Sequence, residues 1–239
     1  MSIPHSQMKG IKMLTKGNNH EPKTIDDIIF GNTESKLRIQ DLVSGAEALP
    51  SCGKSGILLY GVFGTGKTTL AKMLPNAIEE GQTGCSLNWP EEFIGCQQGF
   101  NGPQVMALIQ NILDKNTLNA SGCHYFIIDE VDNLTKLAQQ SLKTAMNTTS
   151  AVFILTTNNI SQLDKGMLDR CILVEMNAAE PDTYFDIATT IASDAGHQLS
   201  NEDLLPIIKA ANGSFRNIFH NVGRMARRKS QQPPPNVIY

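Results

Sequence analysis

The sequence predicts an α/β fold, in which a core with a parallel five-stranded sheet is followed by a small α-helical lid. Two observations predict it. Short apolar runs alternate with helical stretches over residues 21–180, which is typical of strands that lie parallel and are joined by helices. From Pro181 onward the pattern changes to helical stretches alone. The five strands are expected at 56–60, 85–88, 124–130, 151–158 and 172–176.

Length and composition limit the classes of protein to consider. The 239 residues suffice for one large domain or a domain with a small appendage. With a net charge of −3 the chain gains no overall attraction to nucleic acid, so a DNA-binding role needs a local basic surface. Five cysteines without a C-x-x-C pair, and no signal peptide, indicate reduced thiols and a cytoplasmic protein. No apolar run approaches the roughly 20 residues of a membrane span, so no membrane contact is expected.

The start of the chain changes character near residue 21. Residues 1–20 mix three lysines with Gly and Asn and have no sustained period, so we expect a mobile arm. The following patch, Glu21–Gly31, gathers apolar residues that include Ile28 and Ile29, and a helix is expected at 34–48. From its residues alone, this patch would be an ordinary part of the hydrophobic core.

A glycine-rich loop follows the first predicted strand. Its sequence is Gly61-Val62-Phe63-Gly64-Thr65-Gly66-Lys67-Thr68, and a helix follows it. The glycines allow backbone N–H groups to turn inward around phosphates, at which the helix N-terminus also points. Lys67 would neutralise β- and γ-phosphate oxygens, and the Thr68 hydroxyl would complete a Mg²⁺ shell. The alternative, a glycine turn without chemistry, leaves the Lys-Thr pair unexplained. The predicted nucleotide-binding residues here are Gly61, Gly64, Thr65, Gly66, Lys67, Thr68 and Thr69.

The strand at 124–130 ends in two carboxylates. The carboxyl ends of parallel strands converge on the phosphate loop, so Asp129 can hold Mg²⁺ and Glu130 can orient and deprotonate a water for attack on the γ-phosphate. The alternative is that the two acids cap the next helix near Asn133. The strand at 151–158 also ends in polar residues, and Asn158 either faces the γ-phosphate or makes a turn with Asn159.

The C-terminal part is expected to contain three helices. The first is predicted at 183–195, and the second follows the capping box Ser200–Asp203 and ends at Asn212-Gly213. Pro206 within the second helix suggests a later start than the box implies. The third runs from 213 to about 229 and has a basic end, which suits the helix dipole as well as a ligand. The last residues, 231–239, are expected to be a flexible tail. The basic residues at that end are Arg224, Arg227, Arg228 and Lys229.

These motifs together resemble AAA+ ATPases, and less specific motifs resemble the clamp-loader branch of that family. The less specific motifs are the residue sequence of Pro22–Ile29, the helical pattern of Ala138–Met146 and the triplet Asp169-Arg170-Cys171, which is similar to Ser-Arg-Cys. Three features depart from the family. Val62-Phe63 replaces a usual Pro-Pro, the segment 89–102 looks expanded, and the collar domain is missing from this sequence.

The resemblance implies further roles. Ile28 and Ile29 would lie on the adenine side of the nucleotide, and Asn158 would be the polar sensor. Arg216 would be the lid arginine that senses the γ-phosphate, and Arg170 would reach into the ATP site of the neighbouring subunit. Asn88, at the end of the expected second strand, resembles the residue that holds the catalytic glutamate inactive.

The sequence therefore predicts an ATPase that uses ATP and Mg²⁺. Because both faces of the shared site occur in one chain, a head-to-tail homo-oligomer is sufficient, and we expect it to act on DNA or a DNA-bound protein, as a clamp-loader-like, helicase-loader-like or transposition-regulator-like assembly. The rival is a protein-remodelling ATPase that grips a polypeptide with a loop at Phe93-Ile94-Gly95. A scaffold without hydrolysis would leave Glu130 and Arg170 unused. The expected division is an arm (1–20), a nucleotide-binding domain (21–180), a lid (181–230) and a tail (231–239).

Overall fold

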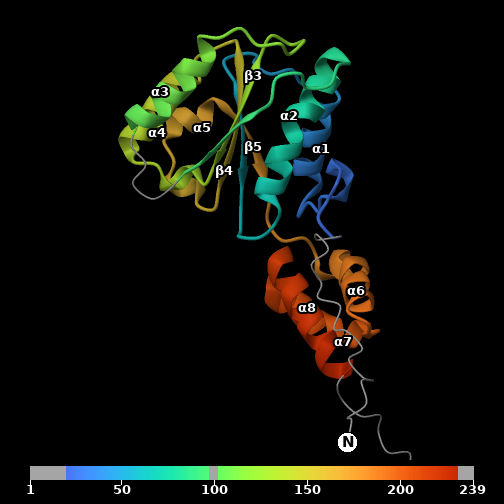
Figure 1. Cartoon of the computed structure of the whole chain (residues 1–239). Coiled ribbons are helices and arrows are strands. Elements are labelled where there is room, and N and C mark those ends of the chain that lie inside the picture. The colour runs from blue at the N-terminus through green and yellow to red at the C-terminus, as the bar shows by residue number, and fades with distance from the viewer. Residues whose placement is uncertain (1–19, 97–101, 231–239) are drawn as a thin grey trace, which may run out of the picture.

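The described part of the chain, residues 20–96 and 102–230 of a computed structural model, contains one parallel sheet. The order across the sheet is β2-β3-β4-β1-β5, and every pairing is parallel (Figure 1). The predicted α/β fold with five parallel strands is confirmed. Apart from His20, the expected arm lies outside the described residues, and so does the tail. The strands are β1 (Gly56–Tyr60), β2 (Glu92–Gly95), β3 (His124–Asp129), β4 (Ala151–Thr157) and β5 (Cys171–Glu175).

Helices cover both faces of the sheet (Figure 1). α1 (Thr33–Val43) and α2 (Lys67–Thr83) cover one face, and α3 (Gly102–Leu113), α4 (Lys136–Ala145) and α5 (Lys165–Asp169) cover the other. Three short 3-10 helices lie in the connections: η1 (Ile25–Asp27), η2 (Val131–Asn133) and η3 (Ile160–Gln162). Among the described residues, every helix is too short or too polar to cross a membrane.

The alternation of side chains along each strand divides the core into two layers. In β1, Ile57 and Leu59 pack in the layer under α1 and α2, whereas Leu58 packs in the layer under α3 and α4. All seven residues of the central strand β4 are buried. This explains why the strands read as nearly continuous apolar runs, since both faces of a parallel sheet are covered by helices.

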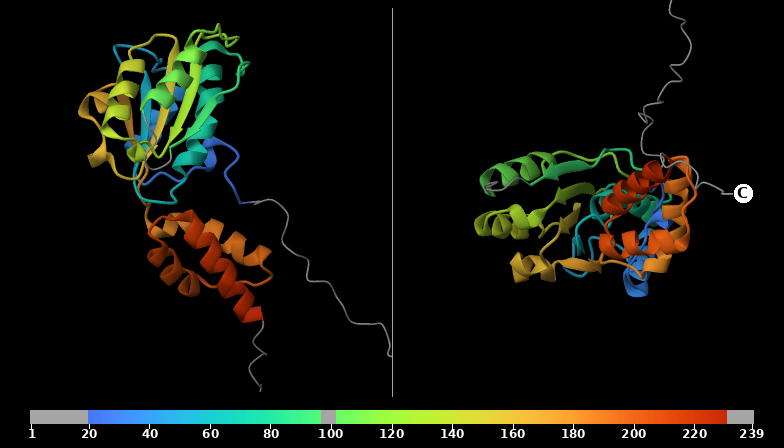
Figure 2. Two further views of the ribbon diagram at one scale, coloured as in Figure 1. Left: turned by 60° about the vertical axis from the view of Figure 1, so that its left-hand side comes forward. Right: turned by 90° about the horizontal axis from the view of Figure 1, so that it is seen from below.

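The C-terminal helices have an apolar core of their own. They are η4 (Pro181–Tyr184), α6 (Phe185–Asp194), α7 (Asn201–Ala211) and α8 (Phe215–Ser230), and they form a separate group beyond the sheet edge at which β1 ends (Figure 2). The predicted capping box is present, and α7 begins directly after Ser200. The expectation that Pro206 delays this start is wrong, because the proline removes only the backbone bond to the carbonyl four residues earlier, in the exposed first turn.

The second strand was predicted at the wrong place. Residues 85–88 form no strand, since distant side-chain amides satisfy their backbone N–H groups. Asn76 accepts from Leu87 N–H at 2.9 Å, and Asn119 accepts from Asn88 N–H at 3.0 Å. The edge strand β2 instead begins at Glu92 and pairs with β3. Its residues alternate in exposure because one side of the sheet edge meets solvent.

Candidate functional site

The glycine-rich loop joins β1 to α2, as predicted. Gly66 is the N-cap residue of α2 with φ 92°, and Gly64 has φ 79°, a region that side chains other than glycine rarely adopt. A Cβ on Gly64 would also lie 2.4 Å from Ser214 Oγ of the segment before α8. The Phe215 N–H of α8 donates to the Gly64 carbonyl at 2.9 Å. The loop is therefore in direct contact with the first turn of the lid's last helix.

Lys67 is a buried cation, only 7% exposed. Its Nζ donates to the carbonyls of Gly61 at 2.9 Å and Val62 at 2.6 Å, and no carboxylate of the described residues lies within ion-pair distance. Burial lowers the pKa of the Lys67 ammonium to about 8, while the nearby Asp129 carboxylate opposes this shift. An anion placed at the loop would therefore be favoured by a cation that the protein has already taken out of water.

Asp129, the last residue of β3, connects the loop to the neighbouring strand. Its Oδ1 accepts from the Thr68 hydroxyl at 2.8 Å and from the Thr156 hydroxyl of β4 at 2.6 Å. Oxygen ligands of this kind suit Mg²⁺, which usually keeps several waters and takes one or two protein ligands beside phosphate. No group of three or more His, Cys, Asp or Glu in the described residues could hold a metal alone. The donor set fits an ion that also binds phosphates.

Glu130 follows β3 in the left-handed backbone conformation, with φ 57° and ψ 50°. Such a conformation is uncommon for a residue other than glycine and is held here by its N–H, which donates to Thr156 Oγ1 at 2.9 Å. The Asn133 side-chain amide donates to Glu130 Oε2 at 3.2 Å and to the Cys96 carbonyl at 3.3 Å. The alternative of a helix cap fails for Glu130, whose side chain makes no capping bond.

A cavity of about 340 Å³ lies between the loop and the lid, within the range of small-molecule sites. Ile28 packs in the core of the α/β part, whereas Ile29 packs against the lid core, so both edges of the cavity are apolar. The structure thus brings nearly all predicted site residues together. Those that line the cavity are Ile28, Ile29, Gly64, Thr65, Gly66, Lys67, Thr68, Thr69, Glu130, Asn158 and Arg216.

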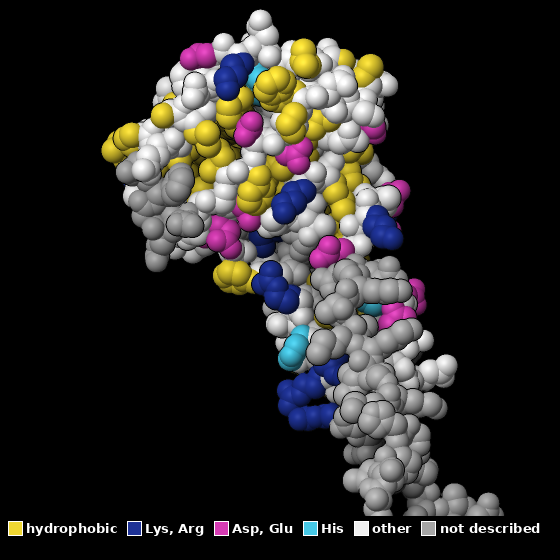
Figure 3. Space-filling model, viewed as in Figure 1, with side chains coloured by type: hydrophobic (Ala, Val, Ile, Leu, Met, Phe, Trp, Pro, Cys, Tyr) yellow, Lys and Arg dark blue, Asp and Glu magenta, His cyan; other side chains and the backbone are white. Residues whose placement is uncertain are grey.

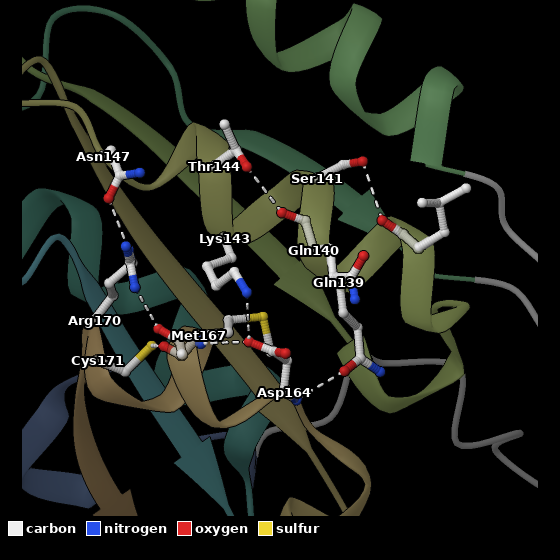
Figure 4. Close-up of polar contacts among 12 residues, drawn as sticks. Gln139, Gln140, Ser141, Lys143, Thr144, Asn147, Asp164, Met167, Arg170 and Cys171 are labelled. Atoms are coloured by element: carbon white, nitrogen blue, oxygen red, sulfur yellow. Dashed lines mark hydrogen bonds and ion pairs between the residues drawn. The ribbon is translucent and has the colours of Figure 1, made fainter.

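Arg170 does not line the cavity. It lies at the other end of the strands, where β1 and β5 begin. It precedes β5, whose first residue is in register with Gly56 at the start of β1, while the loop follows the end of β1. Five residues of strand place the loop and Arg170 roughly 16 Å apart along the strand. Arg170 Nε donates to Asn147 Oδ1 at 2.8 Å, and Nη1 donates to the Gly166 carbonyl at 2.7 Å (Figure 4). Arg170 therefore cannot serve the cavity of its own chain.

The α4–α5 contact beside Arg170 is fixed by polar bonds (Figure 4). Lys143 of α4 pairs with Asp164 at 3.2 Å, and the Asp164 N–H donates to Gln139 Oε1 at 2.9 Å. Asp164 also caps α5 by accepting from the Met167 N–H at 3.1 Å. The short helix that ends at Arg170 is thereby held against α4.

Two predictions about the segment before β3 are wrong. Asn88 is bonded to Asn119, which precedes β3, so it lies toward the strand starts and not beside Glu130 at the strand end. Phe93, Ile94 and Gly95 form no loop, because they are paired with β3 inside β2. Phe93 lies against Lys72 of α2, whose ammonium is 4.9 Å from the ring centroid, and Ile94 is buried.

Two residues of the site were missed by sequence reasoning. Thr156 joins Asp129 to the Glu130 backbone, and Asn133 holds the Glu130 carboxylate. A hydroxyl residue near the end of an otherwise apolar strand was the available signal for Thr156. Nothing in the sequence indicated the Asn133 contact, which depends on the backbone conformation of Glu130.

The sequence is similar to curated replication factor C subunits. It is 25% identical over 202 residues to a replication factor C small subunit 2 of Pyrobaculum arsenaticum, and 27% identical over 203 residues to a small subunit of Haloarcula marismortui. Each match covers 82% of this chain and 58% of the relative, so the chain spans less than two thirds of the relatives' length. These relatives agree with the predicted resemblance to the clamp-loader branch.

Solved structures show the same fold. The Thermotoga maritima RuvB Holliday junction branch migration motor matches with a TM-score of 0.62 and 19% identity, over 85% of this chain and 64% of that one. A DNA polymerase III gamma subunit-related protein of the same organism matches with a TM-score of 0.53 and 14% identity, over 82% of this chain and 60% of that one.

The family model of the ATPases associated with various cellular activities (AAA) matches residues 57–177, about half of the chain, which run from β1 past β5. The chain belongs to this AAA family of ATPases.

Proposed function

We propose that this chain hydrolyses ATP with Mg²⁺ in a head-to-tail oligomer that acts on DNA. The observation that carries the proposal is the separation of two half-sites. A cavity lined by Lys67, Thr68 and Glu130, with Asp129 bonded to Thr68, lies at one end of β1, and Arg170 lies at the other. One half suits the binding of a nucleoside triphosphate, and the other suits the completion of a neighbour's site.

In the proposed site the loop and Lys67 hold the phosphates, and the base lies on the side of Ile28 and Ile29. Backbone N–H groups at a helix start, together with a buried ammonium, favour a polyphosphate anion. Arg216, the exposed arginine of the lid that lines the cavity, contacts the γ-phosphate. Thr68 and Asp129 would hold Mg²⁺, which supplies charge neutralisation at the phosphate oxygens.

Glu130 is the proposed general base. Glu130 and Asn158 both line the cavity, so Glu130 is placed to accept a proton from a water that Asn158 helps to orient. Asn133 and Thr156 are positioning residues, since both bond to Glu130, Asn133 through the carboxylate and Thr156 through the backbone N–H.

Arg170 is proposed to act in trans on the ATP of the next subunit. Its position at the far end of β1 excludes a role in its own cavity, and Asn147, just after α4, and Gly166 of α5 hold its guanidinium. A contact between unlike faces is head-to-tail, which gives a ring if the rotation closes and a spiral or filament if it does not. Copies of this one chain are sufficient.

DNA is the proposed client, because the relatives are replication factor C subunits and a structural neighbour is a Holliday junction branch migration motor. The alternative, a protein-remodelling ATPase, depended on a loop at Phe93-Ile94-Gly95 that grips a polypeptide. These residues form an edge strand and not a loop, so the alternative has no support. We also retain the proposed division into a nucleotide-binding domain at 21–180 and a lid at 181–230, for which the separate apolar core of the C-terminal helices is the support.

The test compares ATP binding and turnover in two variants, with and without duplex DNA. Glu130→Gln keeps the shape of the side chain and removes the base, so ATP should bind and persist, whereas Lys67→Ala should lose binding itself. Wild-type turnover should rise on addition of DNA. Turnover by Glu130→Gln at the wild-type rate would refute the role of Glu130 as general base. A wild-type rate that does not change when DNA is added would refute the proposal that DNA is the client.

A further inference from the structure

The last helix of the lid has a charge opposite to that of the whole protein. α8 contains five Arg and Lys residues among its 16 positions and no Asp or Glu, although the net charge of the chain is −3. The nucleotide site uses only Arg216 at the start of this helix. The remaining positive charge has no role in the proposed hydrolysis.

The basic residues lie on the side of α8 that faces away from the lid core. Ile218, Val222 and Ala226 are fully buried. At about 100° per residue, the opposite side presents an arc of about 100° that extends roughly 12 Å along the helix from residue 220. Its members are exposed, and we name them the basic face of α8. They are His220, Arg224, Arg227 and Arg228.

Figure 3 shows Lys and Arg side chains gathered along one side of the lid, and Figure 1 shows α8 on that side. Within the described part of the chain neither Arg224 nor Arg228 forms an ion pair. Lys229 is different, because it pairs with Asp203 of α7 and is neutralised within the lid.

The helix dipole accounts for only part of this charge. Positive side chains in the last turn are favoured by the C-terminal carbonyls, and this effect declines within that turn. Arg227 and Arg228 lie in the last turn, but Arg224 lies before it. Positive charge that begins before the last turn of α8 therefore points to a ligand.

We propose that the basic face of α8 binds the phosphate backbone of duplex DNA. Duplex DNA carries one negative charge about every 1.7 Å of its axis, so the three arginines of this face can meet several phosphates at once. Guanidinium groups bind phosphate oxygens in pairs, and such contacts do not depend on base sequence. This inference rests on the proposed DNA role and gives that role a surface.

The same helix links this surface to the ATP site. The Phe215 N–H at the start of α8 donates to Gly64 of the phosphate loop, and Arg216 lines the cavity. DNA that binds along α8 therefore contacts the element whose first turn touches the nucleotide site. This arrangement gives DNA a direct physical route to alter ATP turnover.

The experiment measures binding of the full chain to a fluorescent 30-base-pair duplex between 50 and 200 mM KCl. Arg224→Gln/Arg228→Gln removes two charges and keeps good helix formers. Lys36→Gln/Lys115→Gln is the matched control, since it removes two exposed charges elsewhere. If both arginines bind phosphates, the slope of log affinity against log salt falls by about 2, so the ratio of wild-type to variant affinity shrinks about tenfold over this salt range. Two duplexes of unrelated sequence should give the same result.

Each outcome decides between the surface and the DNA role. Weaker binding with a reduced slope in the α8 variant, together with wild-type behaviour of the control, supports the proposal. An equal loss of duplex affinity in both double variants, or wild-type affinity of the α8 variant, would refute DNA binding by the basic face without refuting the DNA role. If the wild-type chain neither binds the duplex nor is stimulated by it, the DNA role and this surface both fail.

Discussion

Lys67 makes ATP binding depend on pH in a direction that the structure specifies. Burial lowers the pKa of its ammonium from 10.5 to about 8. Without nucleotide, about a tenth of the chains carry a neutral Lys67 at pH 7 and about nine tenths at pH 9. ATP phosphates favour the charged form, so binding should take up about 0.1 proton at pH 7 and about 0.9 at pH 9. The dissociation constant of ATP should therefore rise about tenfold between pH 7 and pH 9.

Calorimetric titration in buffers of different ionisation enthalpy measures this proton uptake. Lys67→Arg is the control, because its guanidinium remains charged at pH 9 and accounts for protons exchanged by the nucleotide. The free protein should respond in the opposite sense. Its unfolded chain holds more protons than the folded one between about pH 8 and pH 10.5, so this group adds stability as the pH rises through that window. Equal proton uptake by wild type and Lys67→Arg at pH 9 would refute the reasoning.

Three further variants test individual contacts. Asn133→Ala should leave the Glu130 carboxylate without its positioning hydrogen bond and lower basal turnover without changing ATP affinity; steady-state phosphate release decides, and an unchanged rate removes Asn133 from the mechanism. Thr156→Val should lower the free energy of unfolding by about 1–3 kcal/mol in urea titrations, because it leaves the Glu130 N–H without its acceptor; a loss near zero would contradict this. Asn147→Ala should slow turnover about tenfold by freeing the Arg170 guanidinium, and the effect should vanish in an Arg170→Ala background; an equal loss in that background would mean a purely structural role.

The phosphate loop and the acidic strand end could be predicted because each is specified by adjacent residues. Glycines at fixed spacing before Lys67, and an apolar run that ends at Asp129, need no knowledge of distant contacts. The role of Arg170 was predicted only from the resemblance of Asp169-Arg170-Cys171 to Ser-Arg-Cys. The β1–β5 register adds its place, at the end of the strands opposite to the phosphate loop.

The second strand could not be located because its environment is set by distant residues. Residues 85–88 satisfy their backbone through Asn76 and Asn119, 11 and 31 positions away. β2 itself is a short edge strand of only four residues with mixed exposure, so its apolar pattern is weak. The predictions for Asn88 and for Phe93-Ile94-Gly95 failed together, since both depended on that strand.

Thr156 and Asn133 were missed for a related reason. The contact of Thr156 with Asp129 requires the β3–β4 register, which places Ile128 opposite Leu155. The contact of Asn133 requires the left-handed conformation of Glu130. Neither the strand register nor this backbone conformation can be inferred from the neighbouring residues in the sequence.

The mixing of two inactive variants tests the shared site most directly. Arg170→Ala should bind ATP normally and hydrolyse it more slowly by a factor on the order of 10³, and Lys67→Ala should fail to bind it. In mixed assemblies some interfaces join an intact phosphate loop to an intact Arg170, so the account predicts that turnover returns. The absence of turnover in mixtures whose co-assembly is verified by mass, or full activity of Arg170→Ala alone, would contradict it.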